Sequence, residues 1–142
     1  MTQIDFYTQA GDQLHTACRL AAKARSHGLR VTLFCPDHDT ATRLDRMLWA
    51  VPATGFLPHC TPEDRLAPVT PVLIDTTGDA HVHDEMLINL HTEWPAFFSR
   101  YQRLAEIVGA DDADRAQARS RYKFYRDRGY TIRTHDLSVK ST

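Results

Sequence analysis

The chain has 142 residues, of which 42% are hydrophobic and 25% are charged, and its formal net charge is −1. This length suits one domain with a real core, and the near-neutral charge excludes a large positive field for indiscriminate nucleic-acid binding. No apolar run reaches the roughly 18 residues of a membrane span, so we expect no membrane partner. We expect no disulfide framework, because Cys18, Cys35 and Cys60 are scattered and odd in number, which fits a reducing cytoplasm. We also expect no secretory signal peptide, because the N-terminal residues lack a charged region followed by an apolar region.

The first third of the chain alternates strand-like and helix-like patterns. Residues 3–7 and 30–35 predict strands, and the second is almost continuously apolar, as in a strand covered on both faces. Between them, residues 13–27 predict a helix that Asp12 can cap. A second helix is predicted after the loop at Pro36. Its apolar residues are Ala41, Leu44, Met47, Leu48 and Trp49.

The rest of the chain continues this alternation. Further strands are predicted at residues 56–57, 71–76, 86–90 and 130–134. Pro95 suits the first turn of another helix. The apolar residues of that helix are Phe97, Phe98, Tyr101, Leu104, Ala105, Ile107 and Val108. Strands that alternate with helices predict an α/β layered domain over residues 1–142, with a mainly parallel sheet.

Residues 114–128 predict a basic helix, and Gly129 suits the left-handed position that commonly ends a helix. Side chains three or four positions apart share a helix face. One such stripe consists of Arg115, Arg119, Tyr122 and Arg126. Its cations and aromatic ring suit an anionic ligand that also has an apolar or aromatic group. The stripe can also be read as a solvated basic face, as most charge runs are.

A second notable surface is an apolar, proline-rich passage. Its large, rigid residues are Trp49, Pro52, Phe56 and Pro58. Rigid aromatic side chains form interface hot spots because they bury much area at a small entropic cost. The same residues can also simply cover the core beneath a loop. Both interpretations stay open at this point.

Motifs for catalysis or cofactor binding are missing. The turn after the first strand is not G-x-G-x-x-G, and no G-x-x-x-x-G-K-[ST] occurs. We therefore expect no catalytic residue, no cofactor and no metal. Two alternatives remain. One is a small metal- or nucleotide-dependent enzyme that uses His81, His83 and Asp84. The other is a direct binder of single-stranded nucleic acid that uses the Arg/Tyr stripe as a stacking platform.

Several segments resemble the chi subunit of bacterial DNA polymerase III, a clamp-loader accessory. They are residues 2–7, residues 43–59 with the run Leu48-Trp-Ala-Val-Pro-Ala-Thr-Gly-Phe, Met86-Leu-Ile-Asn-Leu90, and Arg119-Ser-Arg-Tyr-Lys-Phe-Tyr-Arg-Asp-Arg-Gly-Tyr130. The resemblance spans essentially the whole chain. It implies a single Rossmann-like three-layer α/β domain that lacks a nucleotide-binding loop and has no intrinsic catalytic activity.

The resemblance also implies partners and sites. One partner is the acidic C-terminal tail of single-stranded DNA-binding protein, whose site maps to Arg119 and Tyr122, with Arg115 and Val108 flanking them. The other is the psi subunit of the clamp loader. Its surface maps to Trp49, Pro52, Phe56 and Pro58. In some relatives this second surface also meets a helicase. The family needs no direct contact with DNA and acts in the bacterial cytoplasm during DNA replication.

Overall fold

The computed structural model describes residues 1–50, 57–79 and 81–138. Seven strands lie in the described residues: β1 (Gln3–Ala10), β2 (Val31–Phe34), β3 (His59–Cys60), β4 (Val72–Asp75), β5 (Met86–Asn89), β6 (Arg103–Gly109) and β7 (Ile132–Asp136). The α-helices of the same ranges are α1 (Gln13–Ser26), α2 (His38–Ala50) and α3 (Asp112–Asp127), and short 3-10 turns occur at Ala67–Val69 and Phe98–Arg100.

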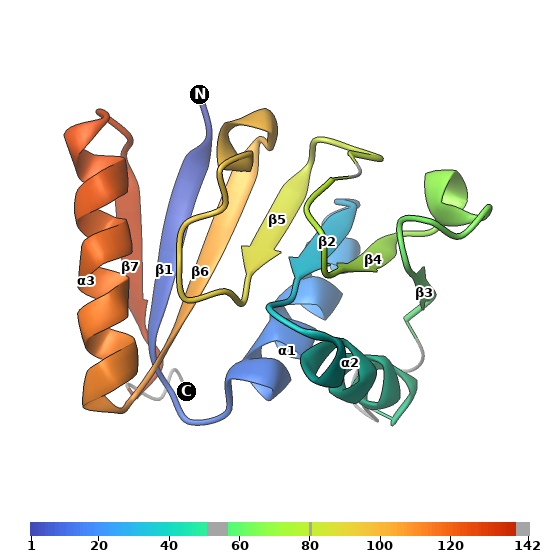
Figure 1. Ribbon diagram of the computed structural model, residues 1–142, viewed down its shortest axis with the longest axis horizontal. Coiled ribbons are helices and arrows are strands. Elements are labelled where there is room, and N and C mark those ends of the chain that lie inside the picture. Colours follow the sequence, from blue (N-terminus) through green and yellow to red (C-terminus); the bar gives the residue numbers. More distant parts are fainter. Residues whose placement is uncertain (51–56, 80, 139–142) are drawn as a thin grey trace.

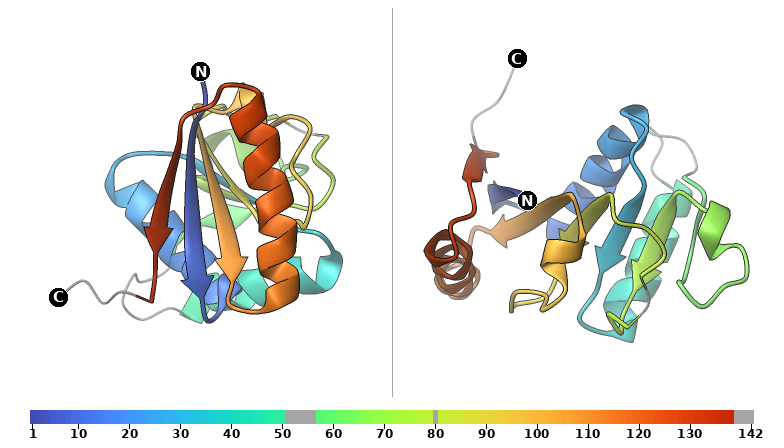
Figure 2. Two further views of the ribbon diagram at one scale, coloured as in Figure 1. Left: turned by 90° about the vertical axis from the view of Figure 1, so that its left-hand side faces the viewer. Right: turned by 90° about the horizontal axis from the view of Figure 1, so that it is seen from above.

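The strands form one sheet in the order β3-β4-β2-β5-β6-β1-β7, and every described pairing is parallel. Helices α1 and α2 cover one face of this sheet, and α3 covers the other face at the β6-β1-β7 end (Figures 1 and 2). The structure thus confirms the predicted α/β class and the Rossmann-like three-layer arrangement. The parallel sheet is consistent with the continuous apolar runs of its inner strands, which are buried on both faces.

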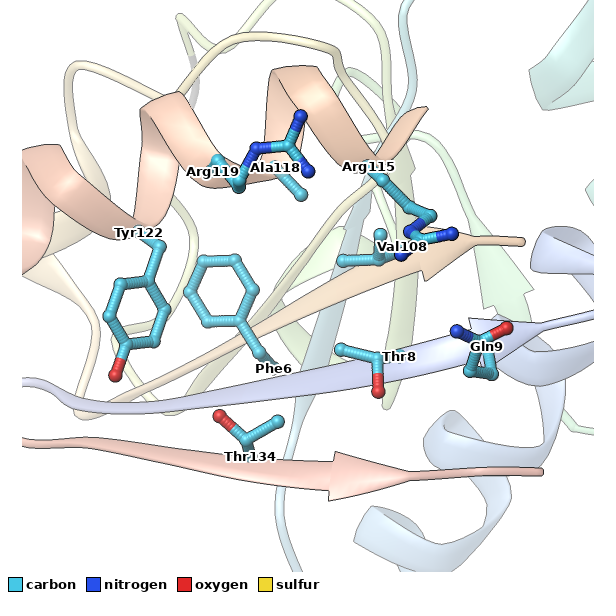
Figure 3. A pocket seen from close by; sticks show the side chains of 9 residues that line it. All are labelled: Phe6, Thr8, Gln9, Val108, Arg115, Ala118, Arg119, Tyr122 and Thr134. Carbon is cyan, nitrogen blue, oxygen red and sulfur yellow. The ribbon is translucent and has the colours of Figure 1, made fainter. Parts of the chain in front are cut away.

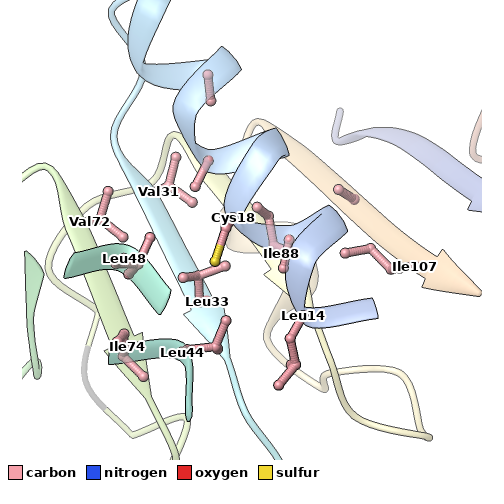
Figure 4. Packing of buried hydrophobic residues seen from close by; sticks show 14 of the residues in the cluster. Leu14, Cys18, Val31, Leu33, Leu44, Leu48, Val72, Ile74, Ile88 and Ile107 are labelled. Carbon is pink, nitrogen blue, oxygen red and sulfur yellow. The ribbon is translucent and has the colours of Figure 1, made fainter. Parts of the chain in front are cut away.

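Each face of the sheet has its own hydrophobic core. Under α1 and α2, Leu14 and Cys18 pack with Leu44, Leu48 and the inner strands (Figure 4). Under α3, the core is largely aromatic. It includes Ile4, Phe6, Leu104, Val108, Phe98, Tyr101, Ala118 and Tyr125. The second core matters for function because it places α3 against β1 and β6.

The ends of the helices follow the sequence signals. The Asp12 carboxylate accepts a hydrogen bond from the His15 N–H at 3.1 Å, so the predicted N-cap of α1 is confirmed. Asp111 caps α3 in the same way, accepting from the Asp114 N–H at 2.8 Å. Gly129 has a φ of 85°, the left-handed conformation expected after the basic helix.

Two of the predicted elements are wrong. The helix predicted after Pro95 is a 3-10 turn followed by strand β6 (Arg103–Gly109), which lies between β5 and β1. Residues 104–109 are all buried, so the alternation that normally reveals a strand is missing. The short strand predicted at residues 56–57 is found instead at His59–Cys60, and Phe56 lies outside the described residues. No helix in the described ranges combines the length and hydropathy needed to cross a bilayer.

Candidate functional site

A pocket lies between α3 and the strands β6, β1 and β7 (Figure 3). Its volume is about 410 Å³, within the range of about 300–1,000 Å³ that is typical of small-ligand sites. The lining residues are Phe6, Thr8, Gln9, Val108, Arg115, Ala118, Arg119, Tyr122 and Thr134. The pocket therefore combines an apolar floor with a cationic wall contributed by the helix.

The structure brings together most of the residues predicted for the anion site. Arg115, Arg119 and Tyr122 reach the pocket from α3, and Val108 reaches it from the end of β6. Arg126 lies two turns beyond Arg119 along α3 and does not line the pocket. Its guanidinium is exposed and contacts the Asp127 carboxylate at 3.5 Å.

Several lining residues come from strands and were not singled out in the sequence. Phe6 on β1 is 2% exposed and forms the floor of the pocket. Its ring meets the Tyr122 ring edge-on, with 5.4 Å between the centroids. This contact fixes the Tyr122 ring beside the apolar floor, which favours a ligand with its own apolar or aromatic side chain.

A β-bulge at the end of β1 shapes the polar side of the pocket. The pairing of β1 with β6 shifts register between Tyr7 and Ala10, and Gln9 adopts a φ of 59°. In a regular strand Thr8 and Gln9 would point to opposite faces of the sheet. The bulge instead places both side chains in the lining (Figure 3). A left-handed conformation is uncommon for a residue other than glycine, and such conformations cluster at functional sites.

The cationic wall is poorly neutralised. Arg119 is exposed and has no ion pair within 4 Å among the described residues. The Arg115 guanidinium approaches the Asp112 carboxylate at 3.8 Å, but both side chains are at least half exposed, so this pair is weak. Two guanidinium groups therefore remain free to bind carboxylate oxygens with charge-assisted hydrogen bonds.

A buried polar network holds α3 in its orientation. Glu106 on β6 is fully buried and accepts hydrogen bonds from Arg121 Nε at 2.9 Å and from the Tyr125 hydroxyl at 2.6 Å. The Asn89 amide donates to both Glu106 oxygens at 3.1 Å, and Arg121 Nη1 donates to the Thr92 carbonyl at 2.7 Å. Burial raises the pKa of Glu106, and the positive charge of Arg121 opposes this shift.

This network decides which side of α3 faces the pocket. With Arg121 and Tyr125 fixed against β6, Arg119 and Tyr122 lie along the flank of the helix that faces β1 and β7. Burial raises the pKa of the Tyr125 hydroxyl, and the nearby Glu106 carboxylate adds to this effect. The Tyr125 hydroxyl therefore stays protonated and remains a hydrogen-bond donor.

The second predicted surface lies at the other edge of the sheet. Trp49, at the end of α2, is 63% exposed, and its indole meets the His59 ring edge-on at 5.7 Å. His59 is anchored by the Asp45 carboxylate at 2.8 Å and by the Leu57 carbonyl at 2.6 Å. Pro58 is exposed beside it. The other two residues predicted for this surface, Pro52 and Phe56, lie outside the described residues.

Comparison with known proteins decides the family. The family model described as "DNA polymerase III chi subunit, HolC" matches residues 1–133. The chain belongs to this family. Three curated relatives are named DNA polymerase III subunit chi. The protein from Pseudomonas aeruginosa is 39% identical over 142 residues, covering 96% of this chain and 98% of the relative. The protein from Haemophilus influenzae is 32% identical, covering 85% of this chain and 85% of the relative. The protein from Escherichia coli is 33% identical, covering 82% of this chain and 80% of the relative.

In this chi-family chain, the histidines considered for a metal site have other contacts. His83 Nε2 lies 2.9 Å from the Thr32 hydroxyl, and its Nδ1 accepts a hydrogen bond from the Glu85 N–H at 3.1 Å. The His81 ring packs edge-on against Phe97 at 5.2 Å. Within the described ranges, no group of three or more His, Cys, Asp or Glu residues is arranged to hold a metal ion.

The two candidate surfaces of this chi-family fold are far apart in the sheet. The pocket uses α3 with β6, β1 and β7, whereas Trp49 and Pro58 lie beside β3, at the opposite end of the strand order. Figure 1 shows α3 at one edge of the sheet and α2 with β3 near the other. Ligands of ordinary size on the two surfaces would therefore not compete for space.

Proposed function

We propose that this chi-family chain is a non-catalytic adaptor that joins the DNA polymerase III clamp loader to single-stranded DNA-binding protein. In this proposal the pocket beside α3 binds the acidic C-terminal tail of that protein. The surface around Trp49 binds the psi subunit. The observation that carries the proposal is the meeting of Arg115, Arg119, Tyr122 and Val108 in one pocket.

The chemistry of the pocket matches a tail that ends in Asp, Pro and a Phe with a free carboxylate. The guanidinium of Arg119 suits the terminal carboxylate or a tail Asp, because a planar fork of donors can bind both oxygens. Phe6 and Val108, with the Tyr122 ring, offer an apolar cleft for the terminal phenyl ring. Gln9, Thr8 and Thr134 supply polar groups for the peptide backbone.

The composition of the lining favours binding over catalysis. Among the described residues, it includes no carboxylate, thiol or imidazole that could act as a nucleophile or as a general base near neutral pH. The cations of the wall can bind an anion but cannot readily give up a proton. A binding role also agrees with the membership of the chain in a family of polymerase subunits.

A single tail contact of this kind is weak, and the adaptor role depends on multivalency. Single-stranded DNA-binding protein presents several tails on lagging-strand DNA, which raises the effective concentration of the ligand. The ion pairs at Arg115 and Arg119 are exposed to solvent, so salt screens them over about 8 Å at physiological ionic strength. We therefore expect tail binding to weaken as salt increases.

Replacing Arg119 with alanine is expected to weaken tail binding at least about tenfold, which corresponds to about 1.4 kcal/mol. The variant loses the guanidinium without disturbing the core, because Arg119 is exposed. Fluorescence anisotropy with a labelled peptide that copies the tail measures this change. Amidation of the peptide's C-terminus should lower the affinity of the wild type as well, because it removes the terminal charge.

Two further variants serve as controls for this measurement. Arg46→Ala removes the same side chain from the exposed surface of α2 and should bind like the wild type. Arg126→Ala should have a smaller effect than Arg119→Ala, because Arg126 does not line the pocket. Absence of saturable binding to the wild type at low salt would rule out the tail site.

Replacing Trp49 with alanine is expected to weaken binding to the psi subunit at least about tenfold, since exposed tryptophans at interfaces are frequent hot spots. The same variant should bind the tail peptide normally, because Trp49 lies at the opposite edge of the sheet from the pocket. Isothermal titration with purified psi subunit, run beside the anisotropy assay, separates the two effects. A Trp49→Ala variant that retains full affinity for psi would refute this assignment.

A further inference from the structure

A second cationic region lies on the sheet face opposite α3. On β1, Asp5 and Tyr7 point away from α3, toward the face on which α1 packs. The parallel register places Arg133 beside Asp5 and His135 beside Tyr7. The side chains of Arg133 and His135 are 56% and 42% exposed. This end of the α1 face is therefore polar and open, unlike the core beneath α1.

Within the described part of the chain, Asp5 is the one buried carboxylate that lies among these basic side chains. Its side chain is 3% exposed and lies 3.1 Å from Arg133 Nε, 2.9 Å from His135 Nε2 and 3.6 Å from Arg103 Nη2. One negative charge thus faces two guanidinium groups and an imidazole. The cluster retains an excess of positive charge, which would attract an anion.

A small pocket adjoins this cluster, between the last turns of α1 and the starts of β5 and β6. Its volume is about 140 Å³. Its lining includes the cationic or basic side chains of Lys23, His27 and Arg103 together with Tyr7, and no carboxylate among the described residues. The pocket is well below the about 300–1,000 Å³ of drug-sized ligand sites, so it suits a small group.

One donor in this pocket region has no acceptor. Arg103 Nε is buried and makes no hydrogen bond within the described part of the chain. A guanidinium is always protonated, so this N–H is a permanent donor. Because this atom has almost no accessible surface, a ligand would meet the terminal nitrogens of the Arg103 side chain, which is 35% exposed. The neighbouring ammonium group of Lys23 favours an anion over a water molecule.

We propose that this pocket binds a phosphate group, held by Arg103 with Lys23 and His27. A phosphate offers several acceptor oxygens, enough for the terminal guanidinium nitrogens of Arg103 and the other donors together. The group can be a free phosphate or one phosphodiester of a single nucleic-acid strand. A strand would continue over the open face, past the stacked rings of Tyr7 and His135, whose centroids are 4.7 Å apart.

The test follows the Arg103 Nε–H signal by NMR during a titration with inorganic phosphate at constant ionic strength. The signal is assigned by its disappearance in Arg103→Lys. We expect a saturable shift in the wild type, and at least a fivefold weaker affinity in Lys23→Ala. Lys123→Ala is the matched control, since it removes an exposed lysine from α3 on the other side of the sheet. It should bind phosphate like the wild type.

A second titration uses a short single-stranded oligothymidylate in the Arg119→Ala background, which removes a main cation of the larger pocket. Competition between this strand and inorganic phosphate for the Arg103 signal supports the site and identifies a strand as its source. A response to inorganic phosphate alone supports the site for a small anion. An Arg103 signal that moves with neither ligand, or equal phosphate affinity in Lys23→Ala and the wild type, would overturn the proposal.

Discussion

Replacing Glu106 with alanine is expected to lower the free energy of unfolding by about 3–5 kcal/mol at neutral pH, the usual cost of removing one partner of a buried ion pair. The substitution leaves the guanidinium of Arg121, whose side chain is 5% exposed, without its carboxylate. The Tyr125 hydroxyl and the Asn89 amide lose an acceptor at the same time. Urea denaturation followed by circular dichroism measures the change.

The pH dependence of stability tests the same network. Because burial raises the pKa of Glu106, the folded state binds an extra proton between the ordinary pKa of about 4.3 and the raised value. Stability should therefore fall as pH rises through this window. In Glu106→Gln, which cannot titrate, this component should vanish. A double variant, Glu106→Leu with Arg121→Met, should be more stable than Glu106→Ala, because it leaves no unpaired buried charge. A loss of stability below about 1 kcal/mol in Glu106→Ala would contradict the role of the network.

Replacing Phe6 with alanine is expected to cost about 3–5 kcal/mol of stability and to abolish tail binding. Phe6 is 2% exposed and packs edge-on against both Tyr122 and Tyr125, so its removal opens a cavity under α3 and takes away the floor of the pocket. Thermal or urea unfolding measures the first effect. Peptide anisotropy, at a temperature where the variant is still folded, measures the second.

Tyr122→Ala provides the contrast to this variant. Tyr122 borders the same pocket but keeps part of its ring exposed, so its loss should cost less stability than the loss of Phe6. Its effect on tail binding should still be large, because the ring forms one wall of the apolar cleft. Equal losses of stability in the two variants would show that Phe6 contributes no more to the hydrophobic core than Tyr122 does.

The part of the site carried by α3 could be read from the sequence. Helical spacing alone places Arg115, Arg119 and Tyr122 on one stripe, and the structure puts all three in the pocket. The stripe also contains Arg126, which the structure leaves outside. Periodicity specifies which side chains share a helix face. It does not specify where the neighbouring strands stop covering that face.

The strand side of the site could not be read in this way. Leu104, Ala105, Ile107 and Val108 have the spacing of an amphipathic helix, yet they belong to β6, which is buried on both faces. Short apolar runs do not distinguish a buried strand from a buried helix. The sequence offered one signal for a strand here: Ile107 and Val108 are β-branched, which favours a strand, and Gly109 directly after them can mark its end.

Other contributions to the pocket depend on tertiary structure alone. Phe6 becomes its floor because β1 lies next to β6, a neighbour about 100 residues away in the sequence. Gln9 enters the lining through a bulge and a φ of 59°, which the residue type does not indicate. Glu106 looks like an ordinary charged residue in the sequence, and its burial depends on three partners from two other elements, Asn89 on β5 and Arg121 and Tyr125 on α3.

The position of β1 in the sheet has a consequence for biosynthesis. Both neighbours of this strand come from the last third of the chain, so that Ile4 pairs with Leu104 and with Ile132. At a translation rate of about 5–20 residues per second, β1 leaves the peptidyl-transferase centre about 5–20 s before the residues of its first partner are made. During this interval Ile4 and Phe6 lack the packing that buries them later. A nascent chain that stalls before β6 therefore carries an unpaired apolar strand, a substrate for chaperones and a starting point for aggregation.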